Sequence, residues 1–216
     1  MNELFGEVTG EEVELYASGR TDAGVHALGQ VANFKIENGI SIEKIPLALN
    51  SKLKKSIRII KAEEVDLEFH SRYHCIRKTY QYRINNSPFG TAIYRNLEYQ
   101  FPLSLDVGKM KQAGKYFIGK HDFKAFKASG TSSKSSERII YELRVEKEGE
   151  RILITVTGNG FLYNMVRIIS GTLVDVGLGK IKPEEISKII QEGNRERAGK
   201  TLPPQGLYLV SVEYEK

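Results

Sequence analysis

The pattern of hydrophobic and polar positions divides the chain into short strands and helices. Residues 31–36 alternate between apolar and polar side chains, as a half-buried strand does, and residues 13–17 are rich in β-branched and aromatic side chains. The same kind of pattern predicts further strands at 57–64, 76–86, 138–146, 152–157 and 207–214. Helical spacing or a long apolar run predicts helices at 41–53, 106–118, 161–176 and 183–191.

Strands and helices alternate in two halves of the chain, without internal repeats. Residues 69–75 are the expected connection between the halves. The pattern predicts an α+β fold with two small sheet-and-helix domains, 1–70 and 71–216, and a cleft between them. A chain of 216 residues with 40% hydrophobic content is long enough to bury a core of this kind.

Residues 18–27 form the most distinctive motif in the chain. Asp22 and Arg20 lie there in a loop between the first two predicted strands, bracketed by Gly19 and Gly24. The glycines permit positive φ or the close approach of another backbone. An Asp presented beside an arginine in such a loop can act as a nucleophile or a base. The spacing also allows a structural role, in which Asp22 caps a turn and pairs with Arg20.

The residues at 19–27, Gly-Arg-Thr-Asp-Ala-Gly-Val-His-Ala, resemble the signature of the tRNA pseudouridine synthase A family. Further segments follow in the order found in that family and extend to the C-terminus. They are Arg77-Lys78-Thr79-Tyr80-Gln81-Tyr82-Arg83-Ile84, Gly119-Lys120-His121-Asp122-Phe123, Asn164-Met165-Val166-Arg167 with Gly171, and Arg197-Ala198-Gly199-Lys200-Thr201-Leu202-Pro203-Pro204.

The resemblance implies two ferredoxin- or RRM-like domains around an active-site cleft, and an isomerase that converts uridine to pseudouridine in the anticodon stem-loop of tRNA. The reaction breaks the bond from ribose to N1, rotates the uracil and rejoins it through C5. It needs no cofactor, because there is no net redox change and no atom is gained. The resemblance also implies a homodimer whose basic surfaces hold the tRNA.

In this reaction Asp22 would supply the anion that forms or stabilises a covalent intermediate. The sequence leaves open whether Asp22 attacks the uracil, attacks the sugar or only assists elimination. Tyr80 would stack on the extruded base and later remove the proton from C5. The alternative for Tyr80 is a core position beside Tyr82, since Lys78, Tyr80 and Tyr82 alternate along one face of a predicted strand.

Arg167 lies among apolar residues of a predicted helix, where an unpaired charge is unfavourable. We therefore expect it to pair with Asp22, while Arg20 faces RNA phosphate. The reverse assignment of Arg20 and Arg167 is one alternative, and an ion pair of Arg167 with Asp175 is another. Both arginines are candidate catalytic residues, and Arg20 is also a candidate substrate-binding residue.

Other candidate substrate-binding residues lie in or near the motifs. His26 is expected either to pack the loop or to contact RNA. Residues 115–138 interleave basic and aromatic side chains and include a loop at 130–136, which is typical of a segment near a phosphate backbone, although a solvated loop is the alternative. His121-Asp122 invites an acid–base interpretation, but a cap of a short helix by Asp122 is simpler. The basic candidates for substrate binding are Lys78, Lys120, Lys124 and Lys127.

Composition narrows the remaining possibilities. The formal net charge of +5 suits a polyanionic partner. A single cysteine, Cys75, excludes a disulfide within the chain and fits a reducing, cytoplasmic setting. The lack of a long apolar run argues against a membrane span, and the four histidines do not match a metal-binding motif, so no metal is predicted. Residues 193–201 end in Gly-Lys-Thr but lack the spacing and flanking elements of a phosphate-binding loop.

The N-terminus departs from the family pattern. Members usually begin with a strand and a turn before a helix, whereas residues 1–6 read as the last turn of that helix, with Gly6 as its end. We therefore expect an incomplete N-terminal domain with an unpaired sheet edge. This expectation supports an alternative function, that of a non-catalytic relative that binds RNA.

Overall fold

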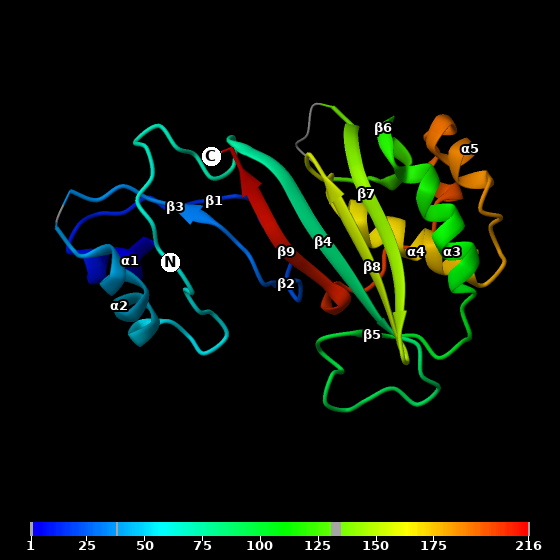
Figure 1. The fold of residues 1–216 in the computed structure, drawn as a ribbon, viewed down its shortest axis with the longest axis horizontal. Coiled ribbons are helices and arrows are strands. Elements are labelled where there is room, and N and C mark those ends of the chain that lie inside the picture. Colours follow the sequence, from blue (N-terminus) through cyan, green and yellow to red (C-terminus); the bar gives the residue numbers. More distant parts are fainter. Residues whose placement is uncertain (1, 38, 131–134, 216) are drawn as a thin grey trace. The chain divides into compact units, whose positions relative to one another are not determined.

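The computed structural model describes residues 2–37, 39–130 and 135–215, which form two compact units (Figure 1). Unit 1 comprises the described parts of Met1–Arg20 and Val31–His74, and unit 2 those of Thr21–Gln30 and Cys75–Lys216. Helices and strands occur in both, so the expected α+β class is confirmed. The units differ from the predicted division at residue 70 mainly because the segment that carries Asp22 groups with unit 2.

Unit 1 begins with helix α1 (Asn2–Thr9), which runs past the predicted end at Gly6. Gly10 ends it instead, with a φ of 77° and an N–H that donates to the Gly6 carbonyl. Gly6 therefore lies inside the helix, and its prediction as a stop is wrong. The left-handed backbone that favours glycine after a helix occurs four residues later.

The other elements of unit 1 are short. Strands β1 (Tyr16–Ala17) and β3 (Ala32–Asn33) pair antiparallel, within the longer strands expected there. The helix predicted at 41–53 is a 3₁₀ turn, η1 (Ile42–Lys44), followed by α2 (Ile45–Lys52), which has its proline in the first turn.

The strand predicted at 57–64 is absent from the described structure. The backbone of Ile59 is bonded in another way, because the Asn50 side-chain amide bonds to both its N–H and its carbonyl, each at 2.8 Å. A side chain thus takes the place of a neighbouring strand at Ile59, and Ile59 and Ala62 pack beside the small core around Leu49.

Unit 2 contains a mixed seven-stranded sheet (Figure 1). Along the sheet the order is β2, β9, β4, β8, β7 and β6, with β5 also paired to β4. The pairs β2–β9 and β4–β5 are parallel and the others antiparallel. The strands are β2 (His26–Ala27), β4 (Cys75–Asn85), β5 (Tyr99–Gln100), β6 (Gly119–Asp122), β7 (Glu137–Glu148), β8 (Arg151–Gly158) and β9 (Leu207–Tyr214).

The strands predicted at 76–86 and 207–214 and the hairpin predicted around Gly149 are confirmed within a few residues. Gly149 has a φ of 59°, the conformation that such a tight turn requires. Alternate residues of β4 and β8 are fully buried against the helices. This core includes Tyr82, Ile84, Ile152, Ile154 and Val156.

The helices of unit 2 pack on that sheet. They are α3 (Val107–Gly114), α4 (Met165–Gly177) and α5 (Glu185–Glu192), with the 3₁₀ turns η2 (Lys115–Phe117), η3 (Lys124–Phe126), η4 (Arg195–Arg197) and η5 (Pro204–Gly206). The helix predicted at 161–176 begins four residues later than expected. Asn164 precedes it in a left-handed conformation that cannot continue a right-handed helix.

Helix α4 lies against the segment that precedes β9 at very close range. A Cβ placed on Gly171 would lie 1.9 Å from the Lys200 carbonyl oxygen, and one on Gly199 would lie 2.5 Å from the Gly171 backbone. The buried Thr172 hydroxyl accepts a hydrogen bond from the Gly199 N–H at 2.8 Å. Two glycines thus allow two backbones to touch, which fixes the segment that ends at Leu202 on the helix.

Candidate active site

The loop that carries Asp22 is attached to the sheet by β2. His26 and Ala27 pair with Tyr208 and Leu209 of β9. Gly24, with a φ of 84°, turns the loop, and a side chain there would press on the Pro204 ring at 3.1 Å. The loop therefore lies on the segment that follows α4, and the Asp22 side chain remains 35% exposed.

Arg167 is the residue that meets Asp22. Its Nη1 donates to Asp22 Oδ2 at 3.1 Å and to Asn164 Oδ1 at 2.6 Å, and its Nε donates to the Leu202 carbonyl at 2.7 Å. The Arg167 side chain is 14% exposed, so its charge is largely removed from water and compensated by Asp22. The expected pairing of Arg167 with Asp22 is therefore present, whereas Asp175 pairs with Lys180.

One oxygen of Asp22 and one nitrogen of Arg167 have no hydrogen-bond partner among the residues that the structure describes. Among the described residues, none donates to Asp22 Oδ1 and none accepts from Arg167 Nη2. The ion pair is thus made through one nitrogen, where a guanidinium can make two parallel bonds. A carboxylate oxygen and an N–H donor are left for a substrate.

Tyr80 lies on β4 with its ring against the core. Its ring meets Phe161 edge to face, with centroids 5.1 Å apart. Burial, with smaller electrostatic contributions from Cys75 and Asp22, raises the pKa of Tyr80 to about 12. The phenol is therefore protonated at neutral pH and well above it.

The neighbouring Tyr82 is fully buried, and its hydroxyl donates to the Pro203 carbonyl at 2.7 Å. Burial raises the pKa of this phenol as well. Tyr82 belongs to the core of unit 2 and Tyr80 is partly buried against that core, a contact that matches the alternative expectation for Tyr80. Tyr82 thus holds the segment 199–204 at Pro203, whereas the ring contact of Tyr80 is with Phe161.

The structure gives the two motif histidines structural contacts. The His26 ring stacks on Tyr208 at 4.7 Å, and its Nε2 lies 2.9 Å from the Asn96 carbonyl. Of the two expectations for His26, these contacts support loop packing. His121 bonds to the Ile118 carbonyl through Nε2.

Asp122 accepts a hydrogen bond from the Lys124 N–H at 3.1 Å. This contact supports the simpler expectation for Asp122, a cap on the turn that follows. Arg20 is exposed and belongs to unit 1.

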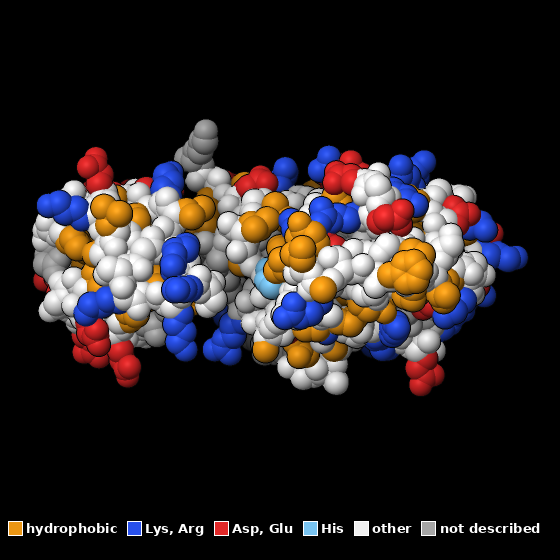
Figure 2. Space-filling model, turned by 90° about the horizontal axis from the view of Figure 1, so that it is seen from below, with side chains coloured by type: hydrophobic (Ala, Val, Ile, Leu, Met, Phe, Trp, Pro, Cys, Tyr) orange, Lys and Arg blue, Asp and Glu red, His pale blue; other side chains and the backbone are white. Residues whose placement is uncertain are grey.

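The basic candidates for substrate binding lie on several elements of unit 2. Lys120 is exposed and pairs with Glu137 at 3.4 Å across β6 and β7, a surface ion pair of small energetic value. Lys124 is exposed and Lys127 and Lys78 are half-buried. Residues 131–134 of the predicted phosphate-binding loop lie outside the described residues. Figure 2 shows Lys and Arg side chains spread across the face that it draws, with hydrophobic side chains between them.

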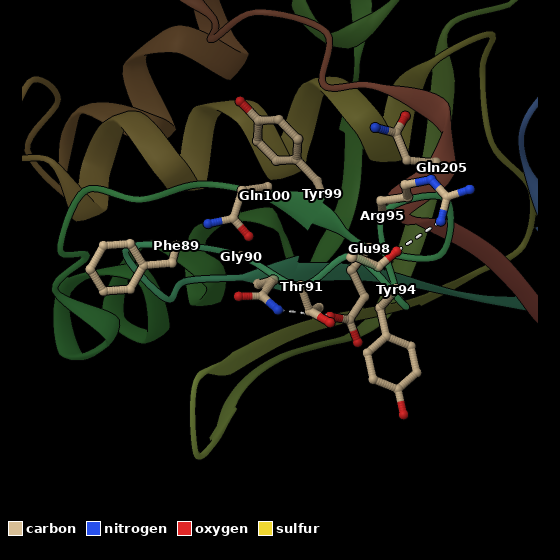
Figure 3. Close-up of a pocket in the computed structure, with 11 residues that line it drawn as sticks. Phe89, Gly90, Thr91, Tyr94, Arg95, Glu98, Tyr99, Gln100 and Gln205 are labelled. Atoms are coloured by element: carbon tan, nitrogen blue, oxygen red, sulfur yellow. Dashed lines mark hydrogen bonds between the residues drawn. The ribbon is translucent and has the colours of Figure 1, made fainter.

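A cavity of about 420 Å³ lies beside β4 and β5 (Figure 3). Its wall includes Glu98, which is 5% exposed and bonds to Asn85 and Arg151. Asp22 and Arg167 are not among the residues that line it. The cavity is therefore separate from the candidate active site.

Within the described ranges, no cluster of His, Cys, Asp and Glu side chains has the arrangement that a metal ion needs. Nor do the helices described there include one with the length and hydrophobicity to cross a membrane.

Sequence reasoning missed two groups of the site, the Asn164 amide and the Leu202 carbonyl. Both lie inside segments that the motif comparison had singled out. Neither group has a signature of its own, because a backbone carbonyl leaves no trace in the sequence and an Asn before a helix normally indicates a cap.

Comparison with known proteins shows the family of this chain. A profile of a family described as tRNA pseudouridine synthase matches residues 2–74 and 113–215. The chain is 52% identical to tRNA pseudouridine synthase A of Caldicellulosiruptor saccharolyticus over 214 residues, which are 99% of this chain and 88% of the relative. It is 51% identical to the enzyme of that name from a Thermoanaerobacter species and 50% identical to tRNA pseudouridine synthase A 2 of Clostridium perfringens, with the same coverage. The chain therefore belongs to the tRNA pseudouridine synthase family, a family of isomerases.

Proposed function

We propose that this protein isomerises uridine to pseudouridine in the anticodon stem-loop of tRNA, with Asp22 as the nucleophile. The observation that carries the proposal is the pairing of Asp22 and Arg167. Arg167 holds one carboxylate oxygen of Asp22, and the other oxygen has no partner among the described residues. The Asp22 side chain is 35% exposed. A fixed but accessible anion is what a covalent or anion-assisted step requires.

The reaction is balanced without an external reagent. The N1–C1′ bond of uridine breaks and a C5–C1′ bond forms; C5 loses its proton and N1 gains one, so that no atom is added or lost overall. Attack on the ribose, attack on the uracil and assisted elimination each need an anion at the position of Asp22. Arg167 orients that anion and offers Nη2 to the substrate.

We assign Tyr80 the role of stacking on the extruded uracil. It offers a neutral ring, since its phenol is protonated at neutral pH and burial raises its pKa to about 12. Arg20, Lys78, Lys120, Lys124 and Lys127 remain the proposed contacts to RNA, and we propose that His26 holds the loop through its contacts with Tyr208 and Asn96. With 32 basic and 27 acidic residues, the chain suits a polyanion, and we propose a homodimer that holds tRNA between basic surfaces in the cytoplasm.

The test is tritium release from tRNA labelled at uracil C5. Replacing Asp22 with Asn should lower the single-turnover rate constant by about 1,000-fold or more, since the nucleophile is lost. The tRNA dissociation constant should change little. Asp175→Asn is the matched control, because it likewise removes the carboxylate of an ion pair: Asp175, on α4, pairs with Lys180.

Two results would contradict the proposal. If the unmodified protein binds tRNA but releases no tritium, the chain is a non-catalytic RNA-binding relative. If Asp22→Asn and Asp175→Asn are equally active, the nucleophile is another group. A thermal unfolding profile of Asp22→Asn should accompany the assay, because the substitution leaves the Arg167 charge uncompensated.

A further inference from the structure

Asn164 has a backbone conformation that side chains seldom adopt. Its φ is 60° and its ψ is 8°, and it is the only non-glycine residue with positive φ in the described ranges. Steric crowding disfavours this region for L-residues, and Asn and Asp tolerate it best after glycine. The position therefore restricts which side chains can occur there.

The Asn164 side chain does not make the bond that an Asn at this place normally makes. Asn164 is the N-cap of α4, yet its side chain accepts no hydrogen bond from the first turn of the helix. Its Oδ1 instead accepts from Arg167 Nη1 at 2.6 Å. The atom facing Arg167 must be the amide oxygen, because a guanidinium only donates.

Asn164 and Asp22 thus share one nitrogen of Arg167. Oδ1 of Asn164 and Oδ2 of Asp22 lie 2.6 and 3.1 Å from Nη1, and the Leu202 carbonyl holds Nε at 2.7 Å. The Asn164 amide oxygen and the Leu202 carbonyl oxygen therefore hold the guanidinium from two segments and define its plane independently of Asp22. Since both of these acceptors are neutral, the full positive charge of Arg167 is available to Asp22.

We propose that Asn164 is a positioning residue, whose neutral amide oxygen holds the Arg167 guanidinium in the orientation that presents Asp22 to the substrate. The inference rests on the proposed role of Asp22. A carboxylate at this position would compete with Asp22 for Nη1, and the loss of the oxygen would free the guanidinium to rotate.

The experiment uses two substitutions that the backbone accepts. Asn164→Gly suits the positive φ and removes only the amide. Asn164→Asp keeps the shape, tolerates the same conformation and places a carboxylate at a helix N-terminus, where it is favourable. A purely structural role predicts that both variants fold and react like the unmodified protein.

We expect both variants to unfold at nearly the unmodified temperature and to lower the single-turnover rate constant for tritium release by about 10- to 100-fold, as expected for a misaligned catalytic group. The rate constant is measured at saturating enzyme, and tRNA affinity is measured separately at fixed salt. The dissociation constant for Asn164→Gly should change by less than about threefold, because Asn164 holds Arg167 and not the RNA.

Asn194→Gly serves as the control, because it removes the Asn cap of η4, which accepts from the Glu196 N–H at 2.9 Å and does not touch Arg167. It should keep the unmodified rate constant. A rate constant equal to that of the unmodified protein in either Asn164 variant overturns the proposal. Asp22→Asn in the same assay separates the two claims. If Asp22→Asn retains activity, the proposed role of Asp22 is refuted. If Asp22→Asn is inactive while Asn164→Gly has the unmodified rate constant, only the proposed role of Asn164 is refuted.

Discussion

The close contact between α4 and the segment before β9 predicts that Gly171→Ala, which adds a single methyl group, lowers the stability of the protein substantially. In Gly171→Ala the new Cβ would lie 1.9 Å from the Lys200 carbonyl oxygen, whereas real Cβ contacts are not closer than 3.0 Å. The two backbones must therefore separate by about 1 Å, the difference between these distances. That movement breaks the bond from the Gly199 N–H to Thr172, which is 2.8 Å long and buried.

The energetic cost follows from these changes. Forcing packed segments apart costs about 1–3 kcal/mol, and a buried N–H left without a partner costs about 1–3 kcal/mol more. Alanine is better than glycine inside a helix by about 1 kcal/mol, which offsets part of the loss. We expect Gly171→Ala to destabilise the protein by about 3 kcal/mol, the middle of this range.

Gly177→Ala provides the control, since it makes the same change at the end of the same helix. Its Cβ would meet the ends of the flexible Met110 and Leu105 side chains at 3.0–3.1 Å, and these can move. We expect a change within about 1 kcal/mol. Urea unfolding followed by circular dichroism measures both variants on the full chain, with the midpoint and the slope fitted together. Equal stability of Gly171→Ala and Gly177→Ala would show that the close contact with Lys200 does not constrain the fold.

Two further predictions concern the same core. Thr172→Val should lower the free energy of unfolding in urea by about 1–3 kcal/mol, because the Gly199 N–H loses its acceptor. Thr172→Ser keeps the hydroxyl and should recover most of that loss. Equal stability of the two variants would contradict this role of the hydroxyl. Burial raises the pKa of Tyr80 from 10.0 to about 12, so the unfolded chain loses this proton first as the pH rises. Stability should fall above pH 10 by up to about 1.4 kcal/mol per pH unit from this group, and Tyr80→Phe should remove that part of the slope; an unchanged slope would argue against burial of the phenol.

Local patterning predicts the elements of unit 2 well and those of unit 1 poorly. The strand at 76–86 and the Gly149 hairpin have strong periodicity and a turn residue that agrees with it, so propensity and tertiary packing favour the same structure. The segment 57–64 has equally suitable residues, but the Asn50 amide occupies its backbone groups at Ile59. A contact of that kind depends on the arrangement in space and has no local signal.

The candidate active site likewise has a part that the sequence predicted and a part that it did not. The charge of Arg167 in an apolar helix predicts an anionic partner from burial alone. The choice of Asp22 over Asp175, and of Arg167 over Arg20, depended on the family resemblance and was not fixed by burial. The two-residue strand β2 is too short for any periodicity, so its parallel pairing with β9 was not foreseen. The contribution of Asn164 was missed because a strained backbone angle is not visible in residue types.

The pairing of β2 with β9 has a consequence for the order in which the protein acquires activity. Asp22 and Arg167 are separated by 145 positions, and the loop with Asp22 is tied down by β9, near the end of the chain. Contacts between residues this far apart in the sequence form late in folding, because the intervening chain must first lose conformational entropy. During synthesis on the ribosome, most of the sheet can form while the Asp22 loop has no strand to join. Catalytic competence should therefore appear only after β9 leaves the exit tunnel.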